Sequence, residues 1–262
     1  MRIALTIASS DPTGGAGLQA DLQVFRSFGV HGAGVVTALT VQDTAKVHSI
    51  LPVFPSVVLD QVRALLSDVT PHAIKIGALG SDDVVRNVDL GLAALAADVP
   101  IVLDPILFSS SGTPLLERRA WSSLGELCAR CTLVTPNVPE AEALSGRDCS
   151  GRRGTEDAAR HFTDELGARA VLVKGGHRDG RVADLLAAPD AAGQLAFTWL
   201  EQDRIDAGPV HGTGCALSSA IAARLALGDA LEEAVAAGRA FVARGIAKAE
   251  PVGSGAHLLV HA

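Results

Sequence analysis

The sequence has few basic residues, few cysteines and no long apolar run. Of its 262 residues, 22 are lysine or arginine and 29 are aspartate or glutamate, so the formal net charge is −7. A protein that binds nucleic acid needs a stripe of positive charge against the phosphates, and no segment supplies one. The mixed-sign stretch 151–161 is interpreted as a solvated loop that leads into a helix. These features exclude nucleic acid as the expected partner.

The four cysteines are too few and too scattered for a disulfide scaffold in a chain of this length. Cys128 and Cys131 form a C-x-x-C pair, but a zinc site would need a second pair at similar spacing, and only Cys149 lies nearby. We therefore favour buried cysteines at a helix–strand junction, and a metal or redox role is the alternative.

No apolar run is long enough to cross a membrane. The apolar run at residues 3–8 is also shorter than the core of a secretory signal, typically about 7–15 residues, and fits a first buried strand better. We therefore expect a cytoplasmic protein with no membrane partner.

Short apolar runs alternate with amphipathic segments along most of the chain. This alternation is typical of a parallel sheet that helices cover on both faces, and no linker, repeat or low-complexity segment interrupts it. Strands are expected at 2–8, 32–41, 72–79, 99–105, 132–137 and 169–176, and a hairpin or edge addition at 182–188 and 195–205. Helices are expected at 16–29, 56–68, 81–98, 117–130, 138–146, 156–167, 215–228 and 230–250. The sequence thus predicts one α/β domain over residues 1–262.

The segment HGTGC places two glycines around Thr213 and a cysteine directly after them, at the start of an expected helix. The backbone N–H groups of Gly212, Thr213 and Gly214 would converge on one point, where the helix dipole adds partial positive charge. This arrangement predicts an anion site. The same field should lower the pKa of the Cys215 thiol. The alternative is a small buried cysteine in a helix of small residues.

Four other places carry polar residues at strand ends, where ligands bind in open α/β sheets. Asp21 lies in the helix after a glycine-rich loop that is neither a P-loop nor a dinucleotide fingerprint, and a capping or solvated carboxylate is its alternative interpretation. Asp104 follows a buried strand. Asn137 and Glu140 have the spacing of a capping box, and alternatively their oxygens could organise Mg²⁺. Lys174 ends an apolar strand, where its charge needs a partner such as phosphate.

In chain order, these segments resemble the ribokinase-like superfamily, and within it the hydroxymethylpyrimidine/phosphomethylpyrimidine kinases of thiamin biosynthesis. The resemblance rests on segments such as IASSDPTGGAGLQAD, VVTALTVQDT, IKIGAL, VLDPILFSSSG, VTPNVPEAEAL, VLVKGGH and HGTGCALSSAIAA, and it extends over residues 7–223. Sugar kinases of the superfamily usually have an aspartate in place of Cys215, whereas the pyrimidine and pyridoxal branch can have cysteine. The resemblance implies a three-layer fold with a mostly parallel central sheet and helices on both faces.

The resemblance also implies a role for each candidate residue in an ATP- and Mg²⁺-dependent kinase. Cys215 would be the base or oxyanion partner, and Gly212, Thr213 and Gly214 the anion hole. The implied substrate-binding residues are Gln42, Asp21, Ser9, Ala78 and Ile106, the phosphate-binding residues Lys174 and Arg239, and the Mg²⁺ residues Asp104, Asn137 and Glu140. We expect a small pyrimidine as substrate and a homodimer as the assembly.

Several positions depart from the family pattern. Ala78 stands where the family has a methionine against the pyrimidine, Ser9 replaces a glycine, DPIL replaces DPVM, and the loop before GTGC reads DAGPVH. Either Leu107 or Phe108 fills the space beside Ala78, or the natural substrate is larger. The alternatives are therefore a pyridoxal kinase of the same branch and a catalytically silent ligand-binding protein.

Overall fold

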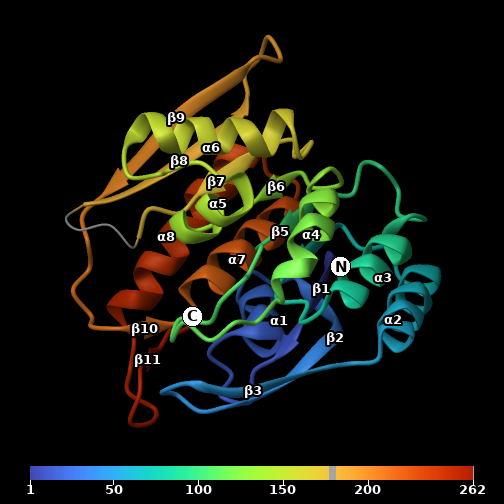
Figure 1. Ribbon diagram of the computed structural model, residues 1–262. Coiled ribbons are helices and arrows are strands. Elements are labelled where there is room, and N and C mark those ends of the chain that lie inside the picture. The colour runs from blue at the N-terminus through green and yellow to red at the C-terminus, as the bar shows by residue number, and fades with distance from the viewer. Residues whose placement is uncertain (177–180, 262) are drawn as a thin grey trace.

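The computed structural model describes residues 1–176 and 181–261. A nine-stranded sheet in the order β3-β2-β1-β4-β5-β6-β7-β8-β9 runs through the molecule (Figure 1). Its strands are β1 (Ile3–Ser10), β2 (His31–Gln42), β3 (Val47–Pro52), β4 (Ala73–Ile76), β5 (Ile101–Leu103), β6 (Leu133–Val134), β7 (Val171–Val173), β8 (Val182–Pro189) and β9 (Leu195–Gln202). The series from β2 to β7 is parallel, whereas β3, β8 and β9 pair antiparallel at the two edges.

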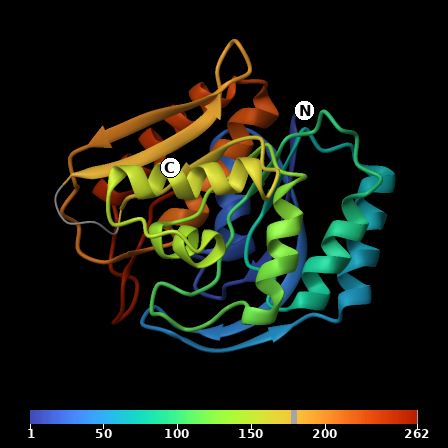
Figure 2. The ribbon, with the colours of Figure 1, turned by 45° about the horizontal axis from the view of Figure 1, so that its top comes forward.

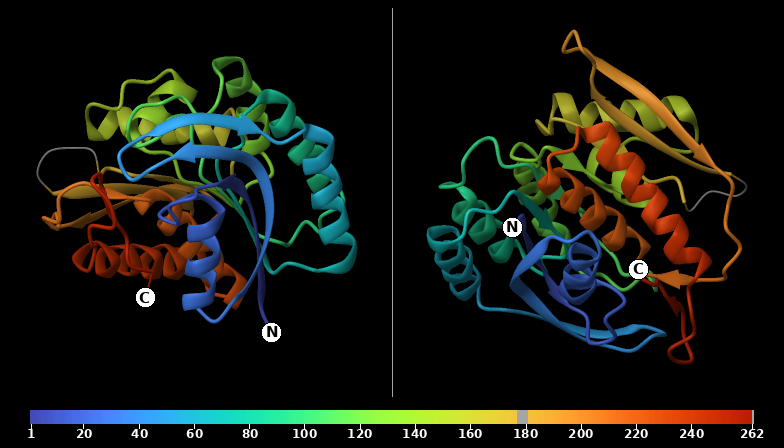
Figure 3. Two further views of the ribbon diagram at one scale, coloured as in Figure 1. Left: turned by 90° about the horizontal axis from the view of Figure 1, so that it is seen from below. Right: turned by 180° about the vertical axis from the view of Figure 1, so that it is seen from behind.

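Helices cover both faces of the sheet, which confirms the three-layer α/β fold (Figures 2 and 3). One layer contains α1 (Gly17–Ser27), α7 (Thr213–Leu227) and α8 (Leu231–Ala247), and the other contains α2 (Pro55–Asp68), α3 (Asp82–Leu92), α4 (Trp121–Cys128), α5 (Val138–Ser145) and α6 (Arg152–Asp164). Each layer buries its own apolar cluster against the sheet, with Phe25 and Ile221 on the first side and Val62 and Phe162 on the second. A short 3₁₀ helix (Arg118–Ala120) precedes α4, and β10 (Val210–His211) pairs with β11 (His257–Leu258) beside the main sheet.

The strand β3 was not predicted, because its side chains are mostly exposed and its apolar residues, Val47, Ile50 and Leu51, do not alternate with polar ones. The turn before it does carry a recognisable signal. The Asp43 carboxylate accepts hydrogen bonds from the backbone N–H groups of Ala45 and Lys46, at 2.8 and 3.0 Å, which stabilises a tight turn from β2 into β3. The predicted hairpin of β8 and β9 is confirmed.

The start of α6 also differs from the prediction, because the helix begins at Arg152 and includes part of the expected loop. Gly154 explains this start. A Cβ atom at this position would lie 1.9 Å from the carbonyl oxygen of Asp148, so only glycine lets the first turn pack against the preceding loop.

The C-x-x-C pair is buried, as predicted. Cys128 and Cys131 donate their S–H groups to the carbonyls of Leu124 and Leu127, one helical turn earlier. Burial raises the pKa of Cys128 to about 12, so this thiol stays protonated. Within the described part of the chain, no helix is long and apolar enough to cross a membrane.

Candidate active site

A cavity of about 680 Å³ runs along the C-terminal ends of the central strands and past the N-terminus of α7. Parallel strands bring their carboxyl ends to one edge of the sheet, so residues that are distant in sequence meet there. All the predicted site residues except Asp21 line this cavity: Ser9, Gln42, Ala78, Asp104, Ile106, Asn137, Glu140, Lys174, Gly212, Thr213, Gly214, Cys215 and Arg239. The motif VLVKGGH ends at residue 177, which lies outside the described residues.

The N-terminus of α7 forms the floor of the cavity. Gly212 has φ = +83°, and a Cβ atom on it would lie 1.7 Å from the carbonyl oxygen of Gly15, so the position requires glycine. A Cβ atom on Gly214 would lie 3.2 Å from the Lys174 Nζ atom, so the first turn runs directly past that ammonium. The open N–H groups of a first helical turn, together with this cation, make the floor a site for an anion.

Asp104 and Lys174 form an ion pair beside this helix terminus. Asp104 Oδ1 accepts a hydrogen bond from Lys174 Nζ at 2.7 Å, and both side chains are largely buried. Thr135 and Ser218 donate to the Asp104 carboxylate at 3.2 and 3.4 Å. Burial alone would lower the pKa of Lys174, but the carboxylates of Asp104 and Glu140 raise it above its ordinary value. Lys174 is therefore charged at neutral pH.

Asn137 and Glu140 form the predicted capping box at the start of α5. The Asn137 side chain accepts from the Glu140 N–H, and the Glu140 carboxylate accepts from the Asn137 N–H, both at 2.8 Å. Both residues also line the cavity, so capping does not remove them from the site. Burial raises the pKa of Glu140 to about 7, although Lys174 opposes the shift.

The side chains at this edge do not form a complete set of magnesium ligands, but they suit an ion that is held partly by waters and substrate phosphates. Among the described residues, no group of three or more histidine, cysteine or carboxylate side chains could hold a metal. The Asp104 carboxylate already accepts from Lys174, and one oxygen of Glu140 accepts from Asn137. Magnesium keeps several waters and often uses one or two carboxylates together with substrate phosphates, and two carboxylates beside an anion site suit that mode.

Cys215 lies in the first turn of α7, but the expected effect on its thiol was wrong. Burial raises the pKa of Cys215 to about 11, although the Lys75 ammonium acts in the opposite direction. Loss of water around the sulfur therefore outweighs the field of the helix terminus, and the thiol form predominates at neutral pH.

Asp21 is the one predicted site residue that the structure places outside the cavity. Its side chain is fully buried and forms an ion pair with Lys75, with Nζ to carboxylate oxygen distances of 2.8 and 2.9 Å. Thr6 and Ser219 each donate a hydrogen bond to this carboxylate at 2.6 Å. The helical pattern put Asp21 on the apolar face of α1, and that face turns toward the core rather than toward the cavity.

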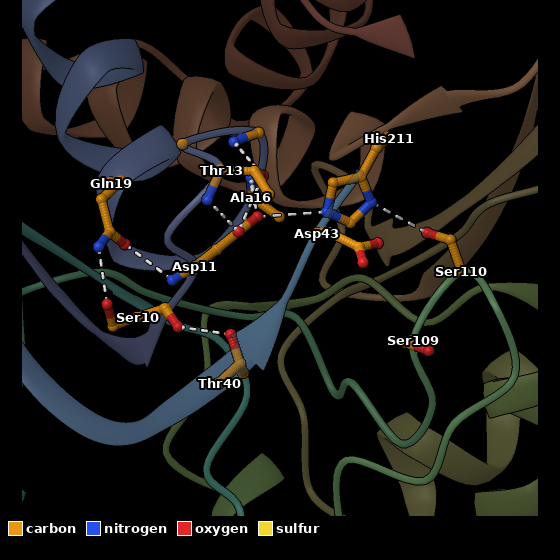
Figure 4. Close-up of polar contacts among 12 residues, drawn as sticks. Ser10, Asp11, Thr13, Ala16, Gln19, Thr40, Asp43, Ser109, Ser110 and His211 are labelled. Atoms are coloured by element: carbon orange, nitrogen blue, oxygen red, sulfur yellow. Dashed lines mark hydrogen bonds and ion pairs between the residues drawn. The ribbon is translucent and has the colours of Figure 1, made fainter. Parts of the chain in front are cut away.

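Sequence reasoning missed several polar residues at the cavity, among them Lys75, Asp11 and His211. Figure 4 shows the Asp11 carboxylate between the loop after β1 and the ring of His211, whose Nε2 atom lies 3.3 Å from it. The other ring nitrogen of His211 lies 3.4 Å from Ser110 Oγ. Burial alone would raise the pKa of Asp11, but hydrogen bonds from His211, Thr13 and Gln42 lower it. The signal that could have found Asp11 is its place directly after the first strand, before Pro12.

Ala78 and Phe108 both line the cavity, whereas Leu107 does not. Ala78 is almost fully buried, and its carbonyl accepts a hydrogen bond from Thr37 at 2.6 Å. Phe108 lines the cavity and packs edge-on against Trp121, with ring centroids 6.3 Å apart. Leu107 is fully buried and is not a lining residue, so Phe108 is the one of the two candidates that borders the site.

Arg239 lines the opposite end of the cavity, where its guanidinium already has protein partners. It donates to Asp184 and to the carbonyl of Leu200, both at 2.8 Å. Asp184 also accepts from the N–H of Gly175, directly after Lys174. Arg239 thus joins α8 to the strands that carry the Lys174 loop.

Known proteins share both this sequence and this fold. Residues 11–260 match the profile of the family described as phosphomethylpyrimidine kinase. The hydroxymethylpyrimidine/phosphomethylpyrimidine kinase of Rhizobium meliloti is 40% identical over 95% of this chain and 91% of its own. The bifunctional thiamine biosynthesis protein ThiED of Geobacter sulfurreducens is 41% identical over 96% of this chain, which spans about half (50%) of that longer protein.

Solved structures agree with these relatives. Phosphomethylpyrimidine kinase from Clostridium difficile is 33% identical with a TM-score of 0.81, and the match covers 94% of this chain and all of that one (100%). The ADP complex of Bacillus subtilis pyridoxal kinase is 28% identical with a TM-score of 0.89, over 100% of this chain and 97% of that one. Because the family profile matches nearly the whole of this chain and a relative is 40% identical over 95% of it, the chain belongs to the phosphomethylpyrimidine kinase family.

Proposed function

We propose that this protein transfers the γ-phosphoryl group of ATP to the hydroxymethyl group of 4-amino-5-hydroxymethyl-2-methylpyrimidine, and then to the resulting monophosphate. One observation supports this most strongly. The helix terminus at Gly212–Gly214, Cys215 and the charged Lys174 line the same cavity as Gln42. A cation and open amides suit a phosphoryl group, and a side-chain amide suits an aminopyrimidine edge.

The two ends of the cavity carry different side chains, and this difference supports a separate place for each substrate. Gln42, Ser9 and Ala78 come from the strand ends near β1, and an amide that both donates and accepts can pair with the amino group and ring nitrogen of a pyrimidine. Val242 and Ile246 of α8 give the other end an apolar wall. We place the adenine there, with the phosphates directed toward Lys174 and α7.

The transfer then needs little covalent chemistry from the protein. The hydroxyl oxygen forms a bond to the γ-phosphorus, the bond from that phosphorus to the bridging oxygen breaks, and ADP leaves. The hydroxyl proton passes to Cys215 Sγ when that sulfur is a thiolate. The amides of Gly212–Gly214 stabilise the charge on the moving phosphoryl group, and the Lys174 ammonium neutralises phosphate charge.

Magnesium would be held at Asp104 and Glu140, with Asn137 beside them, through waters and the nucleotide phosphates. It would supply charge neutralisation of the phosphates. Glu140 contributes to such a site in its ionised form. Because burial raises its pKa to about 7, we expect magnesium to bind more weakly as the pH falls below 7.

Specificity constants for three heterocycles test the proposal. ADP release is measured with the hydroxymethylpyrimidine, its monophosphate and pyridoxal, at the same ATP and magnesium concentrations. We expect the two pyrimidines to give the higher kcat/KM values. A higher value for pyridoxal would identify a pyridoxal kinase, and no ADP release with any of them would identify a ligand-binding protein.

We also propose a homodimer, an expectation that comes from the resemblance of the sequence to this branch of kinases. Sedimentation equilibrium of the purified chain measures the mass directly. A species of twice the 26.8 kDa chain mass supports the dimer, and a single species at the chain mass contradicts it.

A further inference from the structure

The ion pair of Lys75 and Asp21 is a buried charged feature that the reaction described above does not use. Lys75 is on β4 and Asp21 on α1, and neither side chain has any exposed surface. Burying two charges removes them from water, and the mutual attraction repays that loss only in part, so such a pair is weak evidence for a purely stabilising role. Its place in the molecule suggests another use.

The pair is held in one orientation by its neighbours. Asp21 accepts hydrogen bonds from Thr6 and Ser219, at 2.6 Å each, and both its oxygens contact Lys75 Nζ. Ser219 follows Cys215 by one helical turn in α7. The carboxylate is therefore tied to β1 and to α7, and the ammonium is the end of the pair that borders the cavity.

The residue after β4 leaves room for this ammonium. A Cβ atom on Gly77 would lie 2.8 Å from Lys75 Nζ and 3.1 Å from the Cβ atom of Ala8. The absence of a side chain at Gly77 leaves the space that Nζ occupies. A side chain there would displace the ammonium or the neighbouring strand.

Four charged side chains, from four different elements, interact electrostatically with the Cys215 thiol. Asp21 lies on α1, Lys75 on β4, Asp104 after β5 and Lys174 after β7. Burial raises the pKa of Cys215, Asp104 and Asp21 raise it further, and Lys75 is the strongest influence that lowers it. Because α7 packs against β4 and Ser219, one turn after Cys215, donates to the carboxylate that holds Lys75, the ammonium lies beside the part of α7 that carries the sulfur.

We propose that Lys75, fixed by Asp21, is a positioning residue that stabilises negative charge on Cys215 during phosphoryl transfer. It does so through the electric field of its charge, without contact with substrate. This inference rests on the proposed role of Cys215 as the proton acceptor. It accounts for a fully buried lysine next to a cavity that already has Lys174 for the phosphates.

The test measures the thiolate directly and leaves out both substrates. Iodoacetamide alkylates thiolates, so the alkylation rate of Cys215 at pH 8 follows its thiolate fraction. Mass spectrometry locates the label and separates Cys215 from Cys128 and Cys131, which are more deeply buried. Because neither ATP nor a pyrimidine is present, the result does not depend on which heterocycle is the natural substrate.

The main variant replaces both members of the pair, Lys75→Met with Asp21→Asn, so that no unpaired charge stays buried. We expect Cys215 alkylation to slow about tenfold or more, the change in thiolate fraction for one pKa unit, and kcat to fall in parallel. The matched control is Lys248→Met, which removes an exposed lysine just after α8 and should leave the rate unchanged. Alkylation of a folded double variant at the rate of the unmodified protein would overturn the proposal.

A second variant decides the question if the double variant does not fold. Asp21→Asn alone retains the ammonium and removes the carboxylate that raises the Cys215 pKa. We expect faster alkylation of Cys215 at pH 8. An unchanged or slower rate would mean that the charges of this pair do not reach the sulfur, and the pair would then be structural only.

Discussion

Replacing Glu140 by glutamine tests whether burial makes the ionised form of this carboxylate destabilise the folded protein. Glutamine keeps the shape of the side chain, and its carbonyl oxygen can accept the same hydrogen bond from the Asn137 N–H, so the capping box is retained. The substitution removes only the charge. The difference between the two proteins then reports the free energy of placing an ionised carboxylate at this position.

The size of the effect follows from the pKa of Glu140, which rises from 4.5 to about 7 on folding. A raised pKa means that the folded state binds the proton more tightly than the unfolded chain. The stability from this proton is complete below pH 4.5 and is lost as the pH rises through 7. At 1.36 kcal/mol per unit, the total is about 3 kcal/mol, of which about 2–3 kcal/mol falls between pH 5 and pH 8.

Urea unfolding at pH 5 and pH 8, with EDTA present to remove divalent cations, measures this difference. We expect the stability of the Glu140→Gln protein relative to the unmodified protein to increase by about 2–3 kcal/mol from pH 5 to pH 8. The control is Glu233→Gln, because Glu233 accepts from the Ala230 N–H at the start of α8 but is exposed. If the difference in the free energy of unfolding between Glu140→Gln and the unmodified protein is the same at pH 5 and pH 8, the argument from burial is refuted.

Three further substitutions test the site. Cys215→Ser should keep the fold but lower kcat by roughly 10²-fold or more, because a hydroxyl is a far weaker proton acceptor, and an unchanged kcat would return Cys215 to a packing role. Gln42→Ala should raise the KM for the pyrimidine much more than the KM for ATP. Equal effects on the two KM values would show that Gln42 does not bind the pyrimidine. Ala78→Met should overpack the buried cavity wall at this position and weaken pyrimidine binding by about 1–3 kcal/mol in a titration, whereas tighter binding would mean an enlarged pocket.

The fold could be predicted to a large extent because its main signals are local. Short apolar runs bounded by turn residues mark the parallel strands, and the capping box at Asn137 marks the start of α5. β3 was missed because the apolar residues of this exposed edge strand do not alternate with polar ones. Gly154 shows another limit, since its necessity comes from a carbonyl in the preceding loop and is not visible in the sequence around it.

The residues that line the site could be predicted better than their pKa values and ion pairs. Motifs at strand ends identify residues such as Asp104 and Lys174, because the topology brings strand ends together. The pKa of Cys215 could not be predicted, since it depends on how completely the fold excludes water from the sulfur. Asp21 was assigned to the cavity, and its place in the core depends on a partner, Lys75, that is 54 residues away in sequence.

The central claim is that this cavity directs the γ-phosphoryl group of ATP to the pyrimidine, and ³¹P NMR of the products tests it most directly. The protein is incubated with ATP, magnesium and 4-amino-5-hydroxymethyl-2-methylpyrimidine, and the spectrum is followed over time. We predict a phosphomonoester signal, followed by the pair of signals of a diphosphate ester, and both should appear roughly 10²-fold or more slowly with the Cys215→Ser protein. A spectrum that shows only ADP and inorganic phosphate, or no change at all, would contradict the claim.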